Sequence, residues 1–423
     1  MAIQKVSTNP GKKTPGTDNV IWTTPEDRLK ALQELYNQEW SKYKAKPVKR
    51  VWIPKPNGKR RPLGIPTMYD RAAQSLWAFA LIPIAECTGD RNSYAYRPYR
   101  STRDTTQALY LRLGQRYGPM CVLETDIKGF FDHMNHDWLL KNIPMDKHVL
   151  REWLKAGVLE AGNLTETTEG VPQGGPISPI IANMCLDGLE PHIKNIIKET
   201  HDPKWAPKMT IVRYADDLVV TGTTPRLLMF KIKPAIEQYL AERGLSLHPE
   251  NTQLTKVQDG FDFVGHNFRL YEYNKKSRGY TFLVKPSKKS ISNIKSKIKK
   301  LFEEGAAWDA FKLICKLNPV LRGWAYFQQP VVSKEVFGMI DMYLWKKSWK
   351  WGTKKHPKGS RKALKEKYFQ TLGGRNWVFF GVENPKLNDS KKGTLFHVKG
   401  VPIKRHTLIK DENPFLEVNK DYF

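Results

Sequence analysis

Residues 213–220 read Arg-Tyr-Ala-Asp-Asp-Leu-Val-Val, and the other motifs of the chain are arranged around this segment. Apolar and β-branched residues stand on both sides of the two aspartates, a pattern that predicts a strand, a tight turn and a second strand. Asp216 and Asp217 would then share the bend, where neighbouring carboxylates repel each other and lose hydration. A divalent cation with oxygen ligands, Mg²⁺ above all, removes that cost. An ordinary Asp-Asp surface turn is the alternative that this segment leaves open.

A second segment points to the same chemistry. Met120–Ile127 is a β-rich run that ends on the acid Asp126, and Lys128–Asp132 follows as a turn. If this strand lies beside the Asp-Asp hairpin, Asp126 completes a cluster of carboxylates that could hold two metal ions. Two-metal sites stabilise the attacking and leaving oxygens of a phosphoryl transfer.

Asp126 with Phe131 five residues later, followed by Tyr-Ala-Asp-Asp, resembles the palm signature of reverse transcriptases. The resemblance implies that Asp126, Asp216 and Asp217 are catalytic and hold two Mg²⁺ ions, with Mn²⁺ as the alternative. It also implies that Ile127 lies at both the metals and the incoming nucleotide. Phe131 would be an aromatic gate beneath the sugar, leaving no room for a ribose 2′-OH and selecting dNTPs. A phenylalanine in the core is the other interpretation of Phe131.

Composition agrees with a polyanionic partner. The chain carries 70 Lys and Arg against 42 Asp and Glu, a formal charge of +28, which suits nucleic acid but does not separate an enzyme from a structural RNA-binding protein. Its four cysteines form no Cys-x-x-Cys pair, which argues against a zinc ribbon. No signal-type or membrane-spanning run is present, so we expect no membrane partner and a cytoplasmic protein. The resemblance further implies a bacterial protein that associates with the nucleoid or with a ribonucleoprotein.

A basic hairpin is predicted over Val48–Pro66, where two strand-like runs flank Pro-Asn-Gly. The segment resembles the fingers of group II intron reverse transcriptases, and the resemblance puts Lys55 and Arg61 near the triphosphate of the nucleotide. Solvated surface cations are the alternative. Ser93–Pro98 matches a further family motif, in which Tyr96 stands where Phe is usual. There Arg97 would contact template phosphate or form a surface salt bridge.

The loop Glu169–Pro179 contains Pro-Gln-Gly-Gly-x-x-Ser-Pro and opens a helix, for which Ser178 is the predicted N-cap. Its glycines let the backbone approach a nucleotide closely, and Gln173 can hydrogen-bond the sugar or base. The motif resembles that of group II introns rather than of diversity-generating retroelements. A chance loop of this composition is the weaker interpretation.

One position departs from the family. Relatives carry Glu-Lys-Thr where this chain has Glu-Asn-Thr, and the lysine serves the leaving pyrophosphate as an acid. Asn251 cannot donate a proton in this way, so Lys256 or His248 would have to substitute, or the step would be slower. Phe261–Phe268 resembles the primer-positioning turn, in which Gly265 would let the backbone approach the primer end.

Several helices are expected over residues 286–351. Leu317–Phe327 matches the thumb, or domain X, of group II maturases, and the next segment interleaves tryptophans with lysines. Aromatic and basic residues together suit RNA stacking and phosphate contact, whereas a Trp-rich stripe is equally compatible with a core. The RNA-binding candidates are Arg322, Trp324, Trp349 and Trp351. The cysteine-rich HNH nuclease of many relatives is not expected, because no Cys pair follows.

These observations predict an α+β fold: right-hand polymerase fingers and palm with an antiparallel palm sheet, then a helical thumb and a basic C-terminal region. The expected domains are fingers with an N-terminal loop (1–120), palm (121–285), thumb (286–352) and a DNA- or RNA-binding region (353–423). The resemblance implies a group II intron reverse transcriptase and maturase that binds intron RNA, a DNA target and primer, and dNTPs. A defence or CRISPR-associated reverse transcriptase and a non-polymerising splicing cofactor are the alternatives, and monomer and homodimer both stay open.

Overall fold

A computed structural model describes residues 1–54, 58, 60–115, 118–200, 209–274, 279–383, 391–409 and 412–416. The chain divides into two compact units. Unit 1 comprises Met1–Lys256 and Leu408–Phe423, and unit 2 comprises Val257–Thr407. The four domain ranges expected from the sequence stay a prediction. Lys55 lies outside the described residues.

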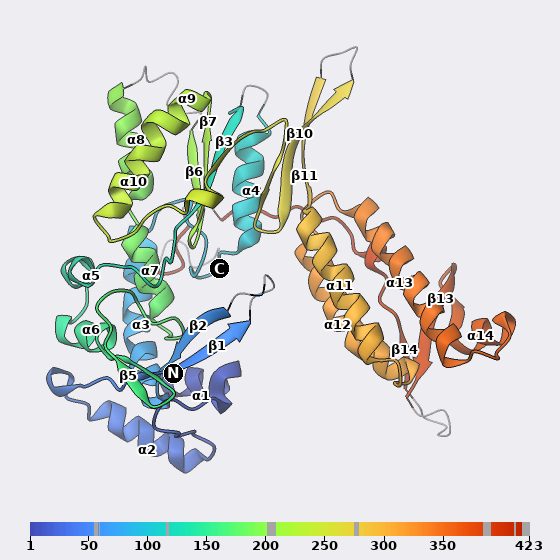
Figure 1. Ribbon diagram of the computed structural model, residues 1–423, viewed down its shortest axis with the longest axis horizontal. Helices are drawn as coiled ribbons and strands as arrows, with labels where there is room; N and C mark the ends of the chain where they lie inside the picture. The colour runs from blue at the N-terminus through green and yellow to red at the C-terminus, as the bar shows by residue number, and fades with distance from the viewer. Residues whose placement is uncertain are drawn as a thin grey trace. The chain divides into compact units, whose positions relative to one another are not determined.

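The centre of unit 1 is a four-stranded antiparallel sheet in the order β6-β7-β3-β8 (Figure 1). Its strands are β3 (Cys121–Asp126), β6 (Thr210–Tyr214), β7 (Asp217–Gly222) and β8 (Gln253–Lys256). Most side chains of β6 and β7 are buried whichever face they point to, since helices cover the sheet. The predicted strand, turn and strand at residues 213–220 are confirmed, and with them the α+β class and its antiparallel sheet.

A second sheet of unit 1 has the order β2-β1-β4-β5. It consists of β1 (Val48–Pro54), β2 (Arg60–Ile65), β4 (Val158–Glu160) and β5 (Asn163–Thr165). β1 and β2 are antiparallel neighbours, which confirms the predicted strand pairing of the basic hairpin, and β1 also pairs in parallel with β4.

Helices surround both sheets. They are α1 (Ala2–Thr8), η1 (Pro10–Lys13), α2 (Pro25–Tyr36), η2 (Trp40–Lys42), α3 (Met68–Thr88), α4 (Thr102–Leu113), α5 (His136–Asn142), α6 (Lys147–Leu154), α7 (Ser178–Leu186), α8 (Leu189–Thr200), α9 (Pro225–Leu227), η4 (Leu228–Ile232), α10 (Lys233–Ala241) and η5 (Pro249–Asn251). α4 packs along β6, and α3 contacts α7. Figure 1 shows α4 alongside the central strands.

Two local predictions in unit 1 are wrong. The expected N-terminal loop contains α1, because Ala2, Ile3 and Val6 form a short apolar stripe that is buried where α1 packs against α3. The predicted N-cap Ser178 is already helical, and its Oγ donates to the carbonyl of Pro172 at 2.8 Å. That bond fastens the glycine-rich loop to the helix that follows it.

Unit 2 combines helices with two small sheets. The first sheet has the order β11-β10-β9, and the second has the order β12-β13-β14. Its elements are β9 (Phe261–Phe263), β10 (His266–Asn274), β11 (Gly279–Pro286), α11 (Lys288–Glu304), α12 (Ala310–Phe327), α13 (Lys334–Lys355), α14 (Arg361–Tyr368), β12 (Phe369–Leu372), β13 (Arg375–Val382), β14 (Lys392–Thr394) and η6 (Val398–Gly400). α11 packs against both α12 and α13 (Figure 1), as expected for a helical thumb. Within the described ranges, no helix has the length and apolarity that crossing a bilayer requires.

A buried histidine makes the stability of unit 2 depend on pH. His266 is fully buried and stacks on Phe327, with ring centroids 5.0 Å apart. Burial lowers its pKa to about 4, and a hydrogen bond with Gln328 opposes the shift. The unfolded chain has an ordinary histidine pKa of about 6.5. Between pH 6.5 and 4, His266 is therefore protonated in the unfolded chain and neutral in the folded chain.

The stabilisation from His266 is thus complete above pH 6.5 and is lost as the pH falls toward 4, by up to about 3 kcal/mol. We expect His266→Phe, which keeps the stacked ring, to flatten this part of the stability profile. Urea denaturation followed by hydrogen exchange of β10 and α12 peptides measures it. Equal slopes for the wild type and the variant between pH 6.5 and 4 would contradict the expectation.

Candidate polymerase site

The carboxylates of the sequence motifs meet at one end of the central sheet. Asp126 is the last residue of β3 and faces Asp217, the first residue of β7, in the strand register. Asp216 occupies the turn between β6 and β7, and its main-chain carbonyl accepts the N–H of Ile127 at 3.1 Å. Ala215 completes the turn with φ 57°, in the left-handed region. The structure therefore brings Asp126, Ile127, Asp216 and Asp217 together.

Asp126 has one oxygen that is suited to a cation. Its Oδ1 is buried and has no hydrogen-bond partner among the described residues, which is costly for a carboxylate. Its Oδ2 accepts a hydrogen bond from Asn251 Nδ2 at 3.0 Å. Within the described part of the chain, no three side chains of His, Cys, Asp or Glu converge as a complete metal cage. The donors fit an ion that takes one or two carboxylates and fills its shell with main-chain oxygen, water and phosphate, as Mg²⁺ does.

The segment that carries Asn251 is fixed to the end of β3. The N–H of His248 donates to the carbonyl of Asp126 at 2.9 Å, and the hydroxyls of Thr252 and Thr125 lie 2.7 Å apart. Asn251 therefore reaches the carboxylate from an anchored turn, η5. At the position where the resemblance predicts a lysine, this chain places an amide that donates to Asp126.

Removing the Asn251 amide should weaken Mg²⁺ binding more than it lowers the rate of incorporation at saturating Mg²⁺. We expect Asn251→Ala to raise the Mg²⁺ concentration at half-maximal nucleotide incorporation by about three- to tenfold, or about 0.6–1.4 kcal/mol, as one exposed hydrogen bond to a carboxylate would. A Mg²⁺ titration of single-nucleotide incorporation measures it, with Gln253→Ala in the neighbouring strand as control. An unchanged Mg²⁺ requirement in Asn251→Ala would rule out this role.

Beneath the Asp-Asp turn lies a buried ion pair. The side chain of Arg213 is 2% exposed, and its guanidinium donates to Asp187 Oδ1 at 2.5 Å and to Asn183 Oδ1 at 3.1 Å. Burial raises the pKa of Asp187 to about 6, with Arg213 opposing the rise, so the carboxylate is ionised at neutral pH. The main chain of Arg213 also bonds to both Asn92 and Tyr94. These contacts fix β6 just before the Asp-Asp turn.

A cavity of about 360 Å³ lies between the basic hairpin and the glycine-rich loop. Both Phe131 and Gln173 line it, as expected for a nucleotide site, together with residues of β1 and β2. The carbonyl of Gln173 accepts the N–H of Gly64 at 2.7 Å. A Cβ at Gly174 would lie 2.6 Å from the carbonyl oxygen of Gly64, and φ there is 130°. Glycine is therefore what lets this loop approach β2.

Tyr96 is a residue of this site that the sequence did not single out. Its φ is 60°, and its ring is half exposed. Burial raises the pKa of Tyr96, the charge of Asp216 adds to the rise, and Arg61 opposes it. Tyr96 therefore lies within electrostatic range of both Asp216 and the predicted triphosphate contact Arg61. In the Ser93–Pro98 motif, Tyr96 stands where phenylalanine is usual. The extra hydroxyl group was the only sequence feature that could have pointed to this residue.

Two other candidates are held by protein contacts. Arg97 pairs with both oxygens of Glu86 at 2.7 and 2.8 Å and donates to the carbonyls of Asp90 and Ser93. Its position favours a salt bridge over template contact, although the bridge is largely buried rather than superficial. Gly265 has φ 84°, and a Cβ there would lie 3.2 Å from the ring of Phe327 within unit 2. The primer role of Gly265 stays a prediction.

The RNA-binding candidates of unit 2 divide into two groups. Trp351 is 6% exposed, and its Nε1 donates to the carbonyl of Gly305 at 2.8 Å, which favours the core role over stacking on RNA. Trp324 is half-buried, and its Nε1 donates to a serine hydroxyl. Trp349 and Arg322 lie instead near the second small sheet, where Arg322 covers the ring of Phe396 at 5.5 Å.

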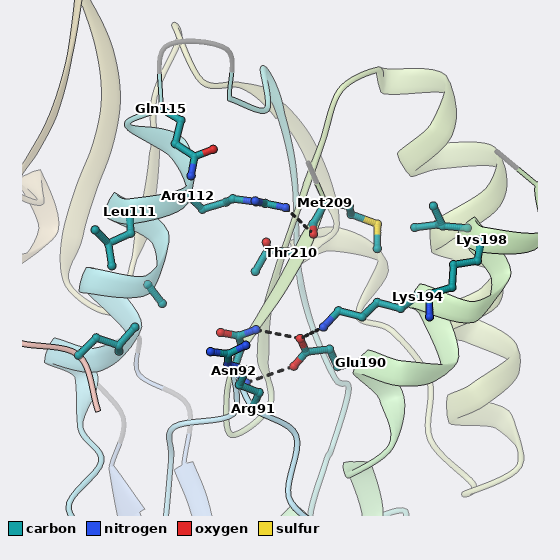
Figure 2. Close-up of a pocket in the computed structure, with 13 residues that line it drawn as sticks. Arg91, Asn92, Leu111, Arg112, Gln115, Glu190, Lys194, Lys198, Met209 and Thr210 are labelled. Carbon is teal, nitrogen blue, oxygen red and sulfur yellow. Dashed lines mark hydrogen bonds and ion pairs between the residues drawn. The ribbon is translucent and has the colours of Figure 1, made fainter. Parts of the chain in front are cut away.

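Another cavity of unit 1, of about 640 Å³, lies at the start of β6 (Figure 2). The Asp-Asp turn follows the other end of that strand. Figure 2 shows Arg112 from α4 and both Lys194 and Lys198 from α8 around it. Glu190 bonds to Asn92 at 2.9 Å and to Lys194 at 2.6 Å. None of the predicted site residues lines this cavity, whereas both Phe131 and Gln173 line the smaller one.

Comparisons with known families agree with this geometry. The family "Reverse transcriptase (RNA-dependent DNA polymerase)" matches residues 53–268. The "Group II intron, maturase-specific domain" matches residues 291–369, and the "N-terminal domain of reverse transcriptase" matches residues 1–35. The maturase match favours the intron context over a defence system.

Three curated proteins illustrate the similarity. Protein YkfC of Escherichia coli is 32% identical over 60% of this chain and 76% of its own length. The group II intron-encoded protein LtrA of Lactococcus lactis is 33% identical over 45% of this chain, but over 32% of its own length. The putative COX1/OXI3 intron 1 protein of Saccharomyces cerevisiae is 26% identical over 72% of the chain and 43% of its own length. The match thus spans less than half of the latter two relatives. On the shared domains and their order, the chain belongs to the family of group II intron-encoded reverse transcriptases and maturases.

Proposed function

We propose that the chain copies RNA into DNA and also binds intron RNA to assist splicing and target-primed mobility. The observation that carries the polymerase proposal is the buried, unpartnered Oδ1 of Asp126, opposite Asp217 and beside the Asp216 turn. An acidic site of this kind is a liability to a basic chain that merely binds RNA, because it repels phosphate. With a divalent cation bound, it instead attracts the triphosphate and the primer end.

The roles of the side chains follow from their positions. We propose that Asp126, Asp216 and the carbonyl of Ile127 hold two divalent ions, with Asp217 supporting them. Oxygen-only donors favour Mg²⁺, and Mn²⁺ is the alternative. When bound, the ions lower the pKa of the primer 3′-OH and offset the charge of the triphosphate. Arg61 and Lys55 would contact the phosphates, Gln173 the sugar or base, and Phe131 would exclude a 2′-OH.

The maturase proposal rests on unit 2. Its maturase-specific match spans α11 to α14, and the exposed faces of these helices carry many lysines. Lysine-rich faces bind the phosphate backbone without reading sequence. The partners proposed on this basis are intron RNA, a DNA target and primer, and dNTPs.

A direct test supplies a primed RNA template with Mg²⁺ and either dNTPs or rNTPs. We expect alkali-resistant cDNA from dNTPs, and incorporation of rNTPs at least about 100-fold slower if Phe131 acts as a steric gate. A parallel filter-binding assay with intron RNA tests the maturase part. No cDNA under conditions of saturating RNA binding would overturn the polymerase proposal and favour a splicing cofactor.

A further inference from the structure

A cavity of about 560 Å³ in unit 2 lies outside the palm and belongs to none of the roles above. Residues from α13, β12, β13 and the segment before η6 line it. Its size is that of a site for a small organic group, for which cavities of about 300–1,000 Å³ are typical. The lining includes both Trp345 and Trp377, which are 36% and 37% exposed.

The indole rings of Trp345 and Trp377 form two sides of the cavity. Trp345 and Trp377 meet edge to face, with centroids 6.2 Å apart, and Trp349 supports Trp377 from behind at 5.5 Å. Phe369 packs on Trp377 at 5.6 Å. Each ring is therefore braced by another and keeps part of its surface in solvent. Such braced, partly exposed aromatics are what a planar ligand needs for stacking.

The backbone beneath Trp377 is strained. Its φ is 61°, a conformation that is unfavourable for a residue with a Cβ. The strain coincides with a β-bulge, where the register between β12 and β13 shifts by one residue beside Gln370. Bulges re-aim side chains next to functional sites. A glycine would fit this bulge without cost, yet the chain carries its largest side chain there.

The charge around the cavity is positive. Arg375 and Lys399 line it, and Lys365 Nζ lies 4.9 Å from the centroid of Trp377. The one acidic side chain among the described lining residues is Asp341, whose two oxygens accept main-chain N–H groups at 3.0 and 2.8 Å. Its charge is therefore compensated locally. Cations on the rim with aromatic walls match the two parts of a nucleotide.

We propose that this cavity receives an unpaired RNA base, stacked on the face of Trp377 with the nearly perpendicular ring of Trp345 at its edge, while Arg375 and Lys399 contact the flanking phosphates. Stacking on aromatic side chains within a basic groove is how proteins hold single-stranded nucleic acid. A base that remains paired in a duplex cannot enter the cavity. The inference rests on the proposed maturase function only for the class of partner, RNA.

The first test replaces the strained tryptophan. Trp377→Gly removes the ring and relieves the positive φ, so the fold should be retained, and thermal unfolding verifies this. We expect about tenfold weaker binding of a single-stranded oligoribonucleotide, because one base–aromatic stack contributes about 1–3 kcal/mol. A blunt RNA duplex of equal charge should lose less than about twofold. Trp377→Phe should restore most of the affinity, and Tyr280→Ala, an exposed aromatic of unit 2 outside the cavity, is the matched control.

The second test locates the base directly. RNA carrying 5-iodouridine is irradiated with the full chain, and cross-linked peptides are identified by mass spectrometry. We expect the peptides containing Trp345 or Trp377, and their loss when unlabelled single-stranded RNA, but not duplex, competes. Equal losses of single-stranded and duplex binding in Trp377→Gly, or cross-links that avoid both peptides, would overturn the proposal.

Repeating the binding assay with a single-stranded DNA oligonucleotide shows whether the unpaired base comes from RNA or from DNA. An effect of Trp377→Gly on RNA, alone or with DNA, supports the assignment, and an effect on DNA alone overturns it. Neither readout needs polymerisation. A chain that makes no cDNA but shows the single-strand effect would therefore lose the polymerase proposal and keep this one.

Discussion

Asp126→Asn is expected to reduce RNA-templated nucleotide incorporation by at least about 1,000-fold, or about 4 kcal/mol of transition-state stabilisation. The amide removes the negative charge and leaves a weaker oxygen ligand at the place where Oδ1 is buried without a partner. In the wild type, Asn251 donates to the carboxylate of Asp126. The substitution therefore places a second amide beside Asn251. Single-turnover incorporation with saturating primer and template measures the loss.

Glu124→Gln is the matched control for that substitution. Glu124 lies two residues earlier on β3, so it shares a face of the strand with Asp126, and it accepts a hydrogen bond from Thr255 at 2.7 Å. We expect its rate to stay within about threefold of the wild type, since it lies away from the carboxylate cluster. Mn²⁺ binding followed by electron paramagnetic resonance should weaken in Asp126→Asn and persist in Glu124→Gln. If Asp126→Asn bound Mn²⁺ and extended the primer normally, Asp126 would not belong to the metal site.

Arg213→Met is expected to destabilise unit 1 by about 3–5 kcal/mol, because it leaves the buried carboxylate of Asp187 without its partner. Equilibrium urea denaturation, followed by hydrogen exchange of β6 and β7, measures the change in unfolding free energy. Lys194→Met removes a half-exposed cation from the buried carboxylate of Glu190, which keeps its two hydrogen bonds from Asn92. It should therefore cost less than half of the loss expected for Arg213→Met.

The double variant Arg213→Met, Asp187→Leu distinguishes the charge from the packing. Replacing both partners of a buried pair by apolar side chains is often nearly neutral, so we expect it to recover more than half of the loss. A double variant as unstable as Arg213→Met alone would show that the guanidinium's other contacts, such as that with Asn183, carry the effect.

The sequence was sufficient where a structure depends on neighbouring residues. The Asp-Asp hairpin and the helices after residue 286 are confirmed. Each follows from turn residues, capping residues or an apolar stripe within one segment. α1 was missed because its stripe of Ala2, Ile3 and Val6 is only one turn long among polar residues.

The environment of the site depends on distant residues and could not be predicted in this way. Arg213 finds Asp187 across 26 positions, and Asn251 finds Asp126 across 125. Nothing near either residue in the sequence indicates its partner. The tryptophans of α13 pose the same difficulty, since only the packing of β12 and β13 shows that Trp351 is buried while Trp345 lines a cavity.

We propose that the carboxylates at the end of β3 and β7 form a DNA-polymerising site. Primer extension on an RNA template with dNTPs and Mg²⁺, by the wild type beside an Asp216→Ala, Asp217→Ala variant of equal RNA affinity, tests it most directly. We expect full-length cDNA from the wild type and none from the variant. Equal extension by both, or extension by neither while RNA remains tightly bound, would contradict it.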